Sequence, residues 1–156
     1  MNDQAAILCE QADSAPERGP STLAAFVLLG AAHEVEARLE AALDPVGLSL
    51  AKHRLLTQLV EAGEPVPLGC LADRCSCVRS NMTQLVDRLE GERLVERIND
   101  PKDRRSVLAS ITSEGRARQL EGAERLAAAD RELFSDLGEG ERETLLHLSQ
   151  RLRAPI

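Results

Sequence analysis

The chain has 156 residues, of which 43% are hydrophobic and 29% are charged, and its formal net charge at pH 7 is −7. These values predict a globular, soluble protein of about one domain, large enough to bury a core without disulfides or metals. No apolar run reaches the roughly 18 residues of a membrane-spanning helix, and the N-terminus lacks the basic start and long apolar stretch of a signal peptide. We therefore expect a cytoplasmic protein with no membrane partner.

The N-terminal segment divides into an arm and a helix. Residues 1–20 show little pattern and contain Pro16, Gly19 and Pro20, which predicts a flexible arm. Ser21 can cap a helix, residues 21–43, that ends at the sequence Asp44-Pro45-Val46-Gly47. The apolar positions of this helix are Leu23, Phe26, Val27, Leu39 and Leu43.

A second helix is expected from its cap at Ser49 to about Ala62. Its buried residues are predicted to be Leu55, Leu56, Leu59 and Val60. Gly63 and two prolines then break the chain, and Val66 between those prolines can form a strand of one or two residues against a later hairpin.

The next segment reads as two helices separated by a tight turn, Leu68 to Arg74 and Arg79 to about Glu90. Met82, Leu85, Val86 and Leu89 fall on one side of the second helix and can pack on a core. The opposite side carries Ser80, Thr83, Gln84 and Arg88. Small hydroxyls, a carboxamide and a guanidinium on one exposed helix face suit the reading of base edges and phosphates. Arg79 and Asn81 flank that face, where contact with phosphate is equally plausible.

A β-hairpin is expected after this helix, with strands Leu94 to Ile98 and Val107 to Ile111. Its connecting residues, 99–105, include three cations: Lys102, Arg104 and Arg105. A helix suited to the major groove beside a basic hairpin defines a winged helix-turn-helix, here residues 44–112. The predicted fold class is therefore mainly α with a small β-hairpin wing.

The distribution of charge agrees with a nucleic-acid interface. Residues 68–105 contain eight Lys or Arg and seven Asp or Glu, whereas the rest of the chain contains 11 basic and 19 acidic residues. Acidic residues are thus concentrated outside the reading segment, as expected if only one face meets double-stranded DNA.

The C-terminal segment, residues 113–156, is expected to form two helices. Thr112 can cap the first, from Ser113 to Leu137, and the sequence Gly138-Glu139-Gly140 separates it from the second, from about Glu141 to Leu152. The predicted apolar positions are Leu120, Ala123, Ala127, Leu133, Phe134 and Leu137 in the first, and Leu145, Leu148 and Leu152 in the second. Helices at both chain ends, each with an apolar stripe, predict dimerisation with a second copy through residues 21–43 and 113–156.

Two stretches resemble the MarR family of bacterial transcription regulators. LADRCSCVRSNMTQLVDRLEGERLVER is similar to the helix-turn-helix of that family, and DPKDRRSVLASITSEGRA is similar to its wing. Two positions depart from the family pattern: Val78 replaces the usual capping Ser or Thr, and Arg93 replaces a common Gly, so that either Arg93 or Gly91 takes the turn before the wing.

The resemblance carries several implications. It implies a homodimer that binds a palindromic operator and releases it when a small-molecule effector binds or when a thiol is oxidised. The expected role is that of a repressor. It also implies that Arg105 enters the minor groove and that Asp103 orients a neighbouring Arg. The effector cleft of the family would correspond to Phe26, Gly30, His33, His53 and Leu56.

Other readings of the sequence stay open. Cys75 and Cys77, before the reading helix, and Cys9, which loosely resembles an N-terminal sensor cysteine, make thiol-based sensing the alternative to an effector. A winged helix can also serve as a protein-interaction module without specific DNA binding. The Cys and His spacings match no standard zinc pattern, and there is no Gly-rich phosphate loop, HExxH or G-x-S-x-G, so we predict no metal, no cofactor and no catalytic residues.

Overall fold

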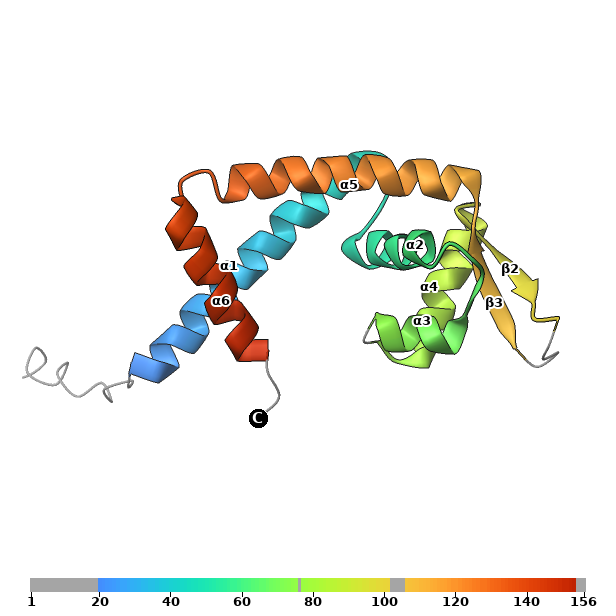
Figure 1. Ribbon diagram of the computed structural model, residues 1–156, viewed down its shortest axis with the longest axis horizontal. Helices are drawn as coiled ribbons and strands as arrows, with labels where there is room; N and C mark the ends of the chain where they lie inside the picture. The colour runs from blue at the N-terminus through green and yellow to red at the C-terminus, as the bar shows by residue number, and fades with distance from the viewer. Residues whose placement is uncertain (1–19, 76, 102–105, 154–156) are drawn as a thin grey trace, which may run out of the picture. The chain divides into compact units, whose positions relative to one another are not determined.

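The computed structural model describes residues 20–75, 77–101 and 106–153 (Figure 1). The described residues divide between two compact units, and the boundary lies inside α1, between Val35 and Glu36. The elements in chain order are α1 (Pro20–Leu43), η1 (Asp44–Val46), α2 (Leu50–Ala62), β1 (Val66–Pro67), α3 (Leu68–Arg74), α4 (Arg79–Gly91), β2 (Val95–Asn99), β3 (Val107–Ile111), α5 (Ser113–Leu133) and α6 (Glu139–Arg153). The predicted class, mainly helical with a small β-sheet, is confirmed.

The second unit has an aliphatic core. No buried side chain in the described part of the chain is polar or charged. The largest buried side chains come from the end of α1, from α2, α3 and α4, and from the start of the wing: Leu43, Leu55, Leu56, Leu59, Leu71, Met82, Val86, Leu89, Leu94 and Val95. Val60 and Leu85 are only partly buried and pack against this cluster.

The helices α2, α3 and α4 begin where the sequence predicts. The Ser49 hydroxyl accepts a hydrogen bond of 3.2 Å from the backbone N–H of Lys52 and so caps α2. By contrast, Val78 precedes α4 and makes no side-chain capping bond. The first-turn N–H groups of α4 therefore have no partner from a capping side chain.

The small sheet is antiparallel with the strand order β1-β3-β2. Val66 pairs with Ala109, so the predicted short strand exists, and Val95 pairs with Ile111 while Asn99 pairs with Val107. The five pairs of β2 and β3 thus run from Val95 and Ile111 to Asn99 and Val107.

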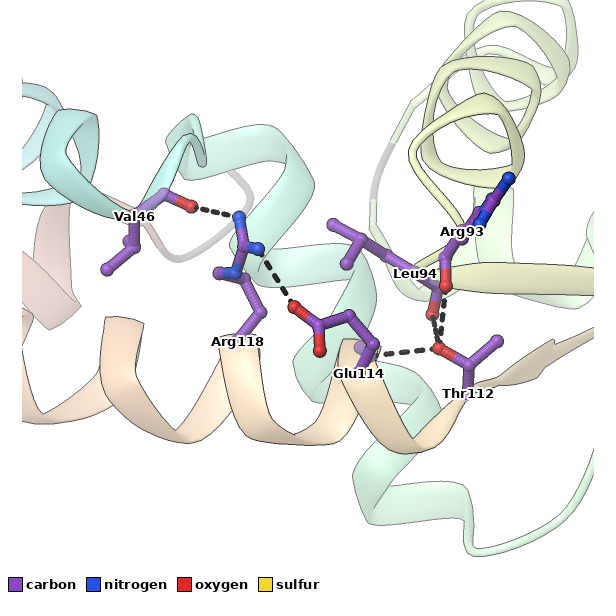
Figure 2. A network of polar contacts seen from close by, with 7 residues as sticks. Val46, Arg93, Leu94, Thr112, Glu114 and Arg118 are labelled. Carbon is purple, nitrogen blue, oxygen red and sulfur yellow. Dashed lines mark hydrogen bonds and ion pairs between the residues drawn. The ribbon is translucent and has the colours of Figure 1, made fainter.

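A left-handed residue joins α4 to the wing. Arg93 has φ of 60°, a conformation that costs a non-glycine residue about 1 kcal/mol. Its carbonyl accepts a hydrogen bond of 2.8 Å from the hydroxyl of Thr112 (Figure 2). The same hydroxyl lies 3.1 Å from the carbonyl of Leu94 and accepts from the backbone N–H of Gly115 at 2.9 Å, so Thr112 both caps α5 and holds this turn.

The boundaries of α1, α5 and α6 differ from the prediction. Helix α1 begins at Pro20, so Ser21 lies inside its first turn and is not the cap; proline is favoured at a first helical position because its missing N–H would have no partner there. Helix α5 ends at Leu133, four residues early, and α6 begins at Glu139. The guanidinium of Arg142 donates to the carbonyls of Phe134 and Leu137, at 2.6 and 3.2 Å, and thereby stabilises the intervening turn.

The apolar stripe predicted for α5 is exposed or partly exposed in the single chain. Leu120 is 60% exposed, and Ala127 is exposed as well. The residues of α5 that are buried are Gly115 and Gly122. A Cβ atom on Gly122 would lie 2.7 Å from Cδ2 of His53 and 3.2 Å from a methyl of Leu43, so the absence of a side chain allows α2 and the end of α1 to approach α5.

None of the described helices combines the length and the hydrophobicity that crossing a membrane requires.

Candidate nucleic-acid interface

Helix α4 separates its apolar and polar residues as the sequence predicts. Met82, Val86 and Leu89 are fully buried, whereas the six predicted reading residues are all exposed: Arg79, Ser80, Asn81, Thr83, Gln84 and Arg88. Their side chains project from one helix that is held to the core by its other face. The hydroxyl of Thr83 donates a 3.1 Å bond to the carbonyl of Arg79, which leaves its lone pairs free to accept.

The wing lies in the same compact unit as α4. The four predicted wing residues, Lys102, Asp103, Arg104 and Arg105, lie outside the described residues, so their geometry is not part of the structure. Beyond the paired residues of β2 and β3, the backbone N–H of Asp100 donates a 3.1 Å hydrogen bond to the carbonyl of Ser106. In the register of β2 and β3, Asn99 and Val107 form the last pair of the ladder.

Arg97 on β2 connects the wing to α4, and sequence analysis did not single it out. Its guanidinium forms an ion pair of 2.5 Å with Asp87 and lies 3.6 Å from the carboxylate of Glu90. It also donates a 3.3 Å hydrogen bond to the carbonyl of Thr83. The sequence contained a signal for it. Arg97 lies two residues after the buried Val95, and residues two apart in a strand point to the same face of the sheet, so Arg97 is on the inward face.

A second ion pair connects α2 to the end of α4. The ammonium of Lys52 lies 2.6 Å from the carboxylate of Glu92 and 3.4 Å from the carbonyl of Gly47. Lys52 is therefore a bridge between the turn that precedes α2 and the turn that follows α4.

A hollow of about 400 Å³ lies beside the predicted reading face. Its lining combines part of that face with residues of α2 and of the preceding turn: Ala51, Cys77, Asn81, Gln84, Leu85 and Arg88. The hollow is small, open and mixed in polarity, and it places a thiol next to the polar face of α4.

The cysteines before α4 are partly buried and the pKa of Cys75 is raised. Burial is the main cause; the charge of Arg54 opposes it and the neighbouring Cys77 adds to it. A raised pKa leaves the thiol protonated at neutral pH, whereas oxidation proceeds through the thiolate. Cys77 directs its sulfur toward the carbonyl of Val78 at 3.6 Å, Cys70 is exposed, and Cys9 lies outside the described residues.

The five residues predicted for an effector cleft have different environments. Phe26, Gly30 and His33 are exposed on the part of α1 that belongs to the first unit. His53 is half-buried on α2, and its Nε2 lies 3.2 Å from the carbonyl of Gln119. Leu56 is fully buried in the core, so it contributes no surface to a cleft in this chain.

Within the described residues, no group of three or more His, Cys, Asp or Glu side chains is arranged to hold a metal ion. Burial lowers the pKa of His53 below its usual range, and its hydrogen bond to the Gln119 carbonyl partly offsets that effect. His53 is therefore neutral at pH 7 and belongs to the contact between α2 and α5.

Comparisons with known proteins agree with this geometry. The model of the MarR family matches residues 48–107. A probable transcriptional regulator from Pseudomonas aeruginosa is 30% identical, with a TM-score of 0.74, and the match covers 82% of this chain and 95% of that one. AbsC, a MarR family transcriptional regulator from Streptomyces coelicolor, is 27% identical, with a TM-score of 0.76, and the match covers 86% of this chain and 90% of that one.

A mutant MarR from E. coli, crystallised with operator DNA, shares the fold at 22% identity, with a TM-score of 0.75 and coverage of 83% of this chain and 93% of that one. No curated protein matches the chain. The family match over the helix-turn-helix and wing, together with the 30% identical relative, decides the classification. The chain belongs to the MarR family of transcription regulators.

Proposed function

We propose that this protein is a homodimeric repressor that binds a palindromic operator and releases it when a small molecule binds. The observation that carries the proposal is α4. Met82, Val86 and Leu89 on its apolar side are fully buried. Its opposite side presents Ser80, Thr83, Gln84 and Arg88 to solvent, and the hairpin whose connecting sequence is cationic belongs to the same unit. Such a helix can enter the major groove while the hairpin follows the adjacent backbone.

The likeness to relatives supports DNA binding. The E. coli protein with the same fold was crystallised on operator DNA. In this chain Arg79, Asn81 and Arg88 can contact phosphates at the edges of the groove. Lys102, Arg104 and Arg105 supply the cations of the wing, and Asp103 orients one of them.

Dimerisation is supported by exposed apolar residues at both ends of the chain. Helix α6 exposes Leu145, Leu146, Leu148 and Leu152, and α1 exposes Leu23, Phe26, Val27, Leu28 and Leu29. An apolar hollow of about 680 Å³ on α6 and the turn before it is lined in part by Leu137, Leu145 and Leu148. A second copy that covers these residues removes them from water and gives the twofold symmetry that a palindrome requires.

For the switch, the raised pKa of Cys75 favours a small-molecule effector over thiol oxidation. The residues predicted for the effector cleft, Phe26, Gly30, His33, His53 and Leu56, include a single aromatic ring and therefore favour an effector that makes mainly aliphatic contacts. A variant with all four cysteines replaced by Ser or Ala separates the two mechanisms. We expect it to bind and release operator DNA as the native protein does; release of the native protein alone by mild peroxide would establish thiol sensing instead.

Selection of bound duplexes from a random DNA pool tests the function. We expect a palindrome whose half-sites lie about one helical turn, ~34 Å, apart, and an affinity that falls steeply with salt. Recovery of no common sequence, with equal and salt-insensitive binding to all duplexes, would instead identify a protein-interaction module.

A further inference from the structure

We propose that Arg97 is a positioning residue for DNA reading, which couples the recognition helix α4 to the wing. This inference rests on the proposed DNA binding, because its consequence is a change in operator specificity. Arg97 stands on β2, yet each hydrogen-bonding or ionic partner that the described residues give it belongs to α4.

The contact geometry makes Arg97 a three-point clamp. Its Nη2 atom reaches the Asp87 carboxylate at 2.5 Å and the backbone carbonyl of Thr83 at 3.3 Å, and its Nη1 atom lies 3.6 Å from the Glu90 carboxylate. These acceptors lie at positions i, i+4 and i+7, one stripe of the helix. A planar guanidinium with several fixed donors can hold such a stripe in one orientation, whereas a flexible ammonium cannot.

The surroundings of Arg97 add to this constraint. Its strand partner Ala109 is fully buried, so the stem of Arg97 starts against the core side of the sheet. Its Nε atom is buried and, among the described residues, has no hydrogen-bond partner. Leaving a guanidinium N–H unpaired is unfavourable, so the carboxylate contacts at the other end of the group must hold it in place.

The clamped stripe directly adjoins the proposed reading face. Thr83, whose carbonyl Arg97 holds, is itself one of the reading residues, and Asp87 lies one residue before Arg88. A rotation of α4 about its axis would therefore move the reading side chains relative to the wing. Rigid support of a binding site by surrounding contacts is what maintains its geometry to within about 0.5 Å.

The charges give the proposal a distinctive prediction. If Arg97 acted as a cation for DNA, removing its acidic partner would free that cation and strengthen binding. If Arg97 acts as a clamp, removing either partner loosens α4 and weakens specific binding. Arg97→Gln and Asp87→Asn therefore change affinity in the same direction under our proposal and in opposite directions under direct phosphate contact.

The experiment measures dissociation constants for the selected operator and for a scrambled duplex over a range of salt concentrations. We expect Arg97→Gln and Asp87→Asn each to lose roughly tenfold in operator affinity, the effect of about one mismatched base pair, with scrambled-duplex affinity within about twofold of native. Arg97→Lys should fall between native and Arg97→Gln. The matched control is Arg125→Gln, which removes an ion-paired arginine of α5 and should leave the specificity ratio unchanged.

Hydrogen exchange of the free protein supplies a readout that does not depend on DNA. We expect faster exchange in α4 in Arg97→Gln, with exchange in α2 unchanged. A native protein that prefers no duplex would refute the proposed function, and the exchange result would still decide whether Arg97 clamps α4.

Other outcomes would overturn the clamp. If Arg97→Gln lost affinity equally for the operator and the scrambled duplex, and if the slope of log affinity against log salt became shallower by about one, Arg97 would be a phosphate contact. Faster exchange throughout the core would identify a purely structural role. If α4 of Arg97→Gln exchanged its amide hydrogens at the native rate and the variant kept the native ratio of operator to scrambled-duplex affinity, Arg97 would not position the helix.

Discussion

The guanidinium of Arg118 on α5 donates a 2.8 Å hydrogen bond to the backbone carbonyl of Val46, 72 residues earlier in the chain (Figure 2). The same side chain pairs with Glu114 at 2.9 Å. Val46 belongs to the 3-10 turn between α1 and α2. Arg118 therefore connects α5, which follows the wing, to the 3-10 turn that precedes α2.

Arg118→Ala should destabilise the protein by about 1 kcal/mol. Hydrogen bonds to charged groups contribute somewhat more than this in general, but 33% of this side chain is exposed, so we expect the lower figure. Chemical denaturation measures the change. Arg125→Ala is the control, because it removes only an exposed i,i+4 ion pair with Glu121; an equal effect in both variants would contradict the role of the Val46 contact.

Gly115→Ala should destabilise the protein by about 3 kcal/mol. A Cβ atom at this position would lie 2.0 Å from the carbonyl oxygen of Leu94 and 2.9 Å from the Ile111 side chain, so the backbone must move. In a free helix the same substitution is favourable by up to ~1 kcal/mol. The control is Gly140→Ala in α6, where nothing lies within 4 Å of the added atom and stability should be unchanged or slightly higher.

The winged helix-turn-helix, residues 44–112, could be predicted from the sequence better than the helices on either side of it. Amphipathic spacing was sufficient for α2 and α4, because each of them buries an apolar stripe against the core of the same chain, and the Ser49 and Thr112 caps marked the starts of α2 and α5. The contact of α5 with the core was not predicted, because glycines, which periodicity treats as neutral, are its buried residues. At the early end of α5, Arg142 of α6 donates to the carbonyls of Phe134 and Leu137, a contact between two helices that the periodicity of one helix does not indicate.

His53 should make stability depend on pH. Burial lowers its pKa below the usual value of 6.5, with the Gln119 carbonyl partly opposing. The unfolded chain therefore takes up the proton first as the pH falls, so the free energy of unfolding is highest above the unfolded pKa and decreases below about 6.5. Denaturation between about pH 7.5 and 5.5 should show this decrease in native protein and less of it in His53→Gln. An unchanged slope in His53→Gln would contradict the assignment, and the same change at the exposed His147 is the control.

Arg105→Ala and Gln84→Ala test the two parts of the proposed interface. Each should weaken operator binding by about 1–3 kcal/mol while leaving the dimer intact, because a base or groove contact is lost without a change in the core. Mobility-shift titrations at moderate salt measure the effect. The control is Gln58→Ala, which makes the same substitution in α2, outside the proposed interface. Native affinity in Arg105→Ala would show that the wing does not contact DNA.

Charges placed on α6 should prevent dimerisation. Leu145 and Leu148 are 39% and 48% exposed in the single chain, and they line the apolar hollow on this helix. Replacing both by Asp would force two carboxylates into a surface that a second copy is expected to cover, where unpaired charge is strongly unfavourable. Sedimentation at micromolar concentration should show a dimer for the native protein and a monomer for the variant. The control is Ile98→Asp, which adds a charge to an exposed apolar position of the wing. A native monomer, or a double variant that still sediments as a dimer, would show that α6 does not form the interface. The two recognition helices would then need another surface to set their spacing.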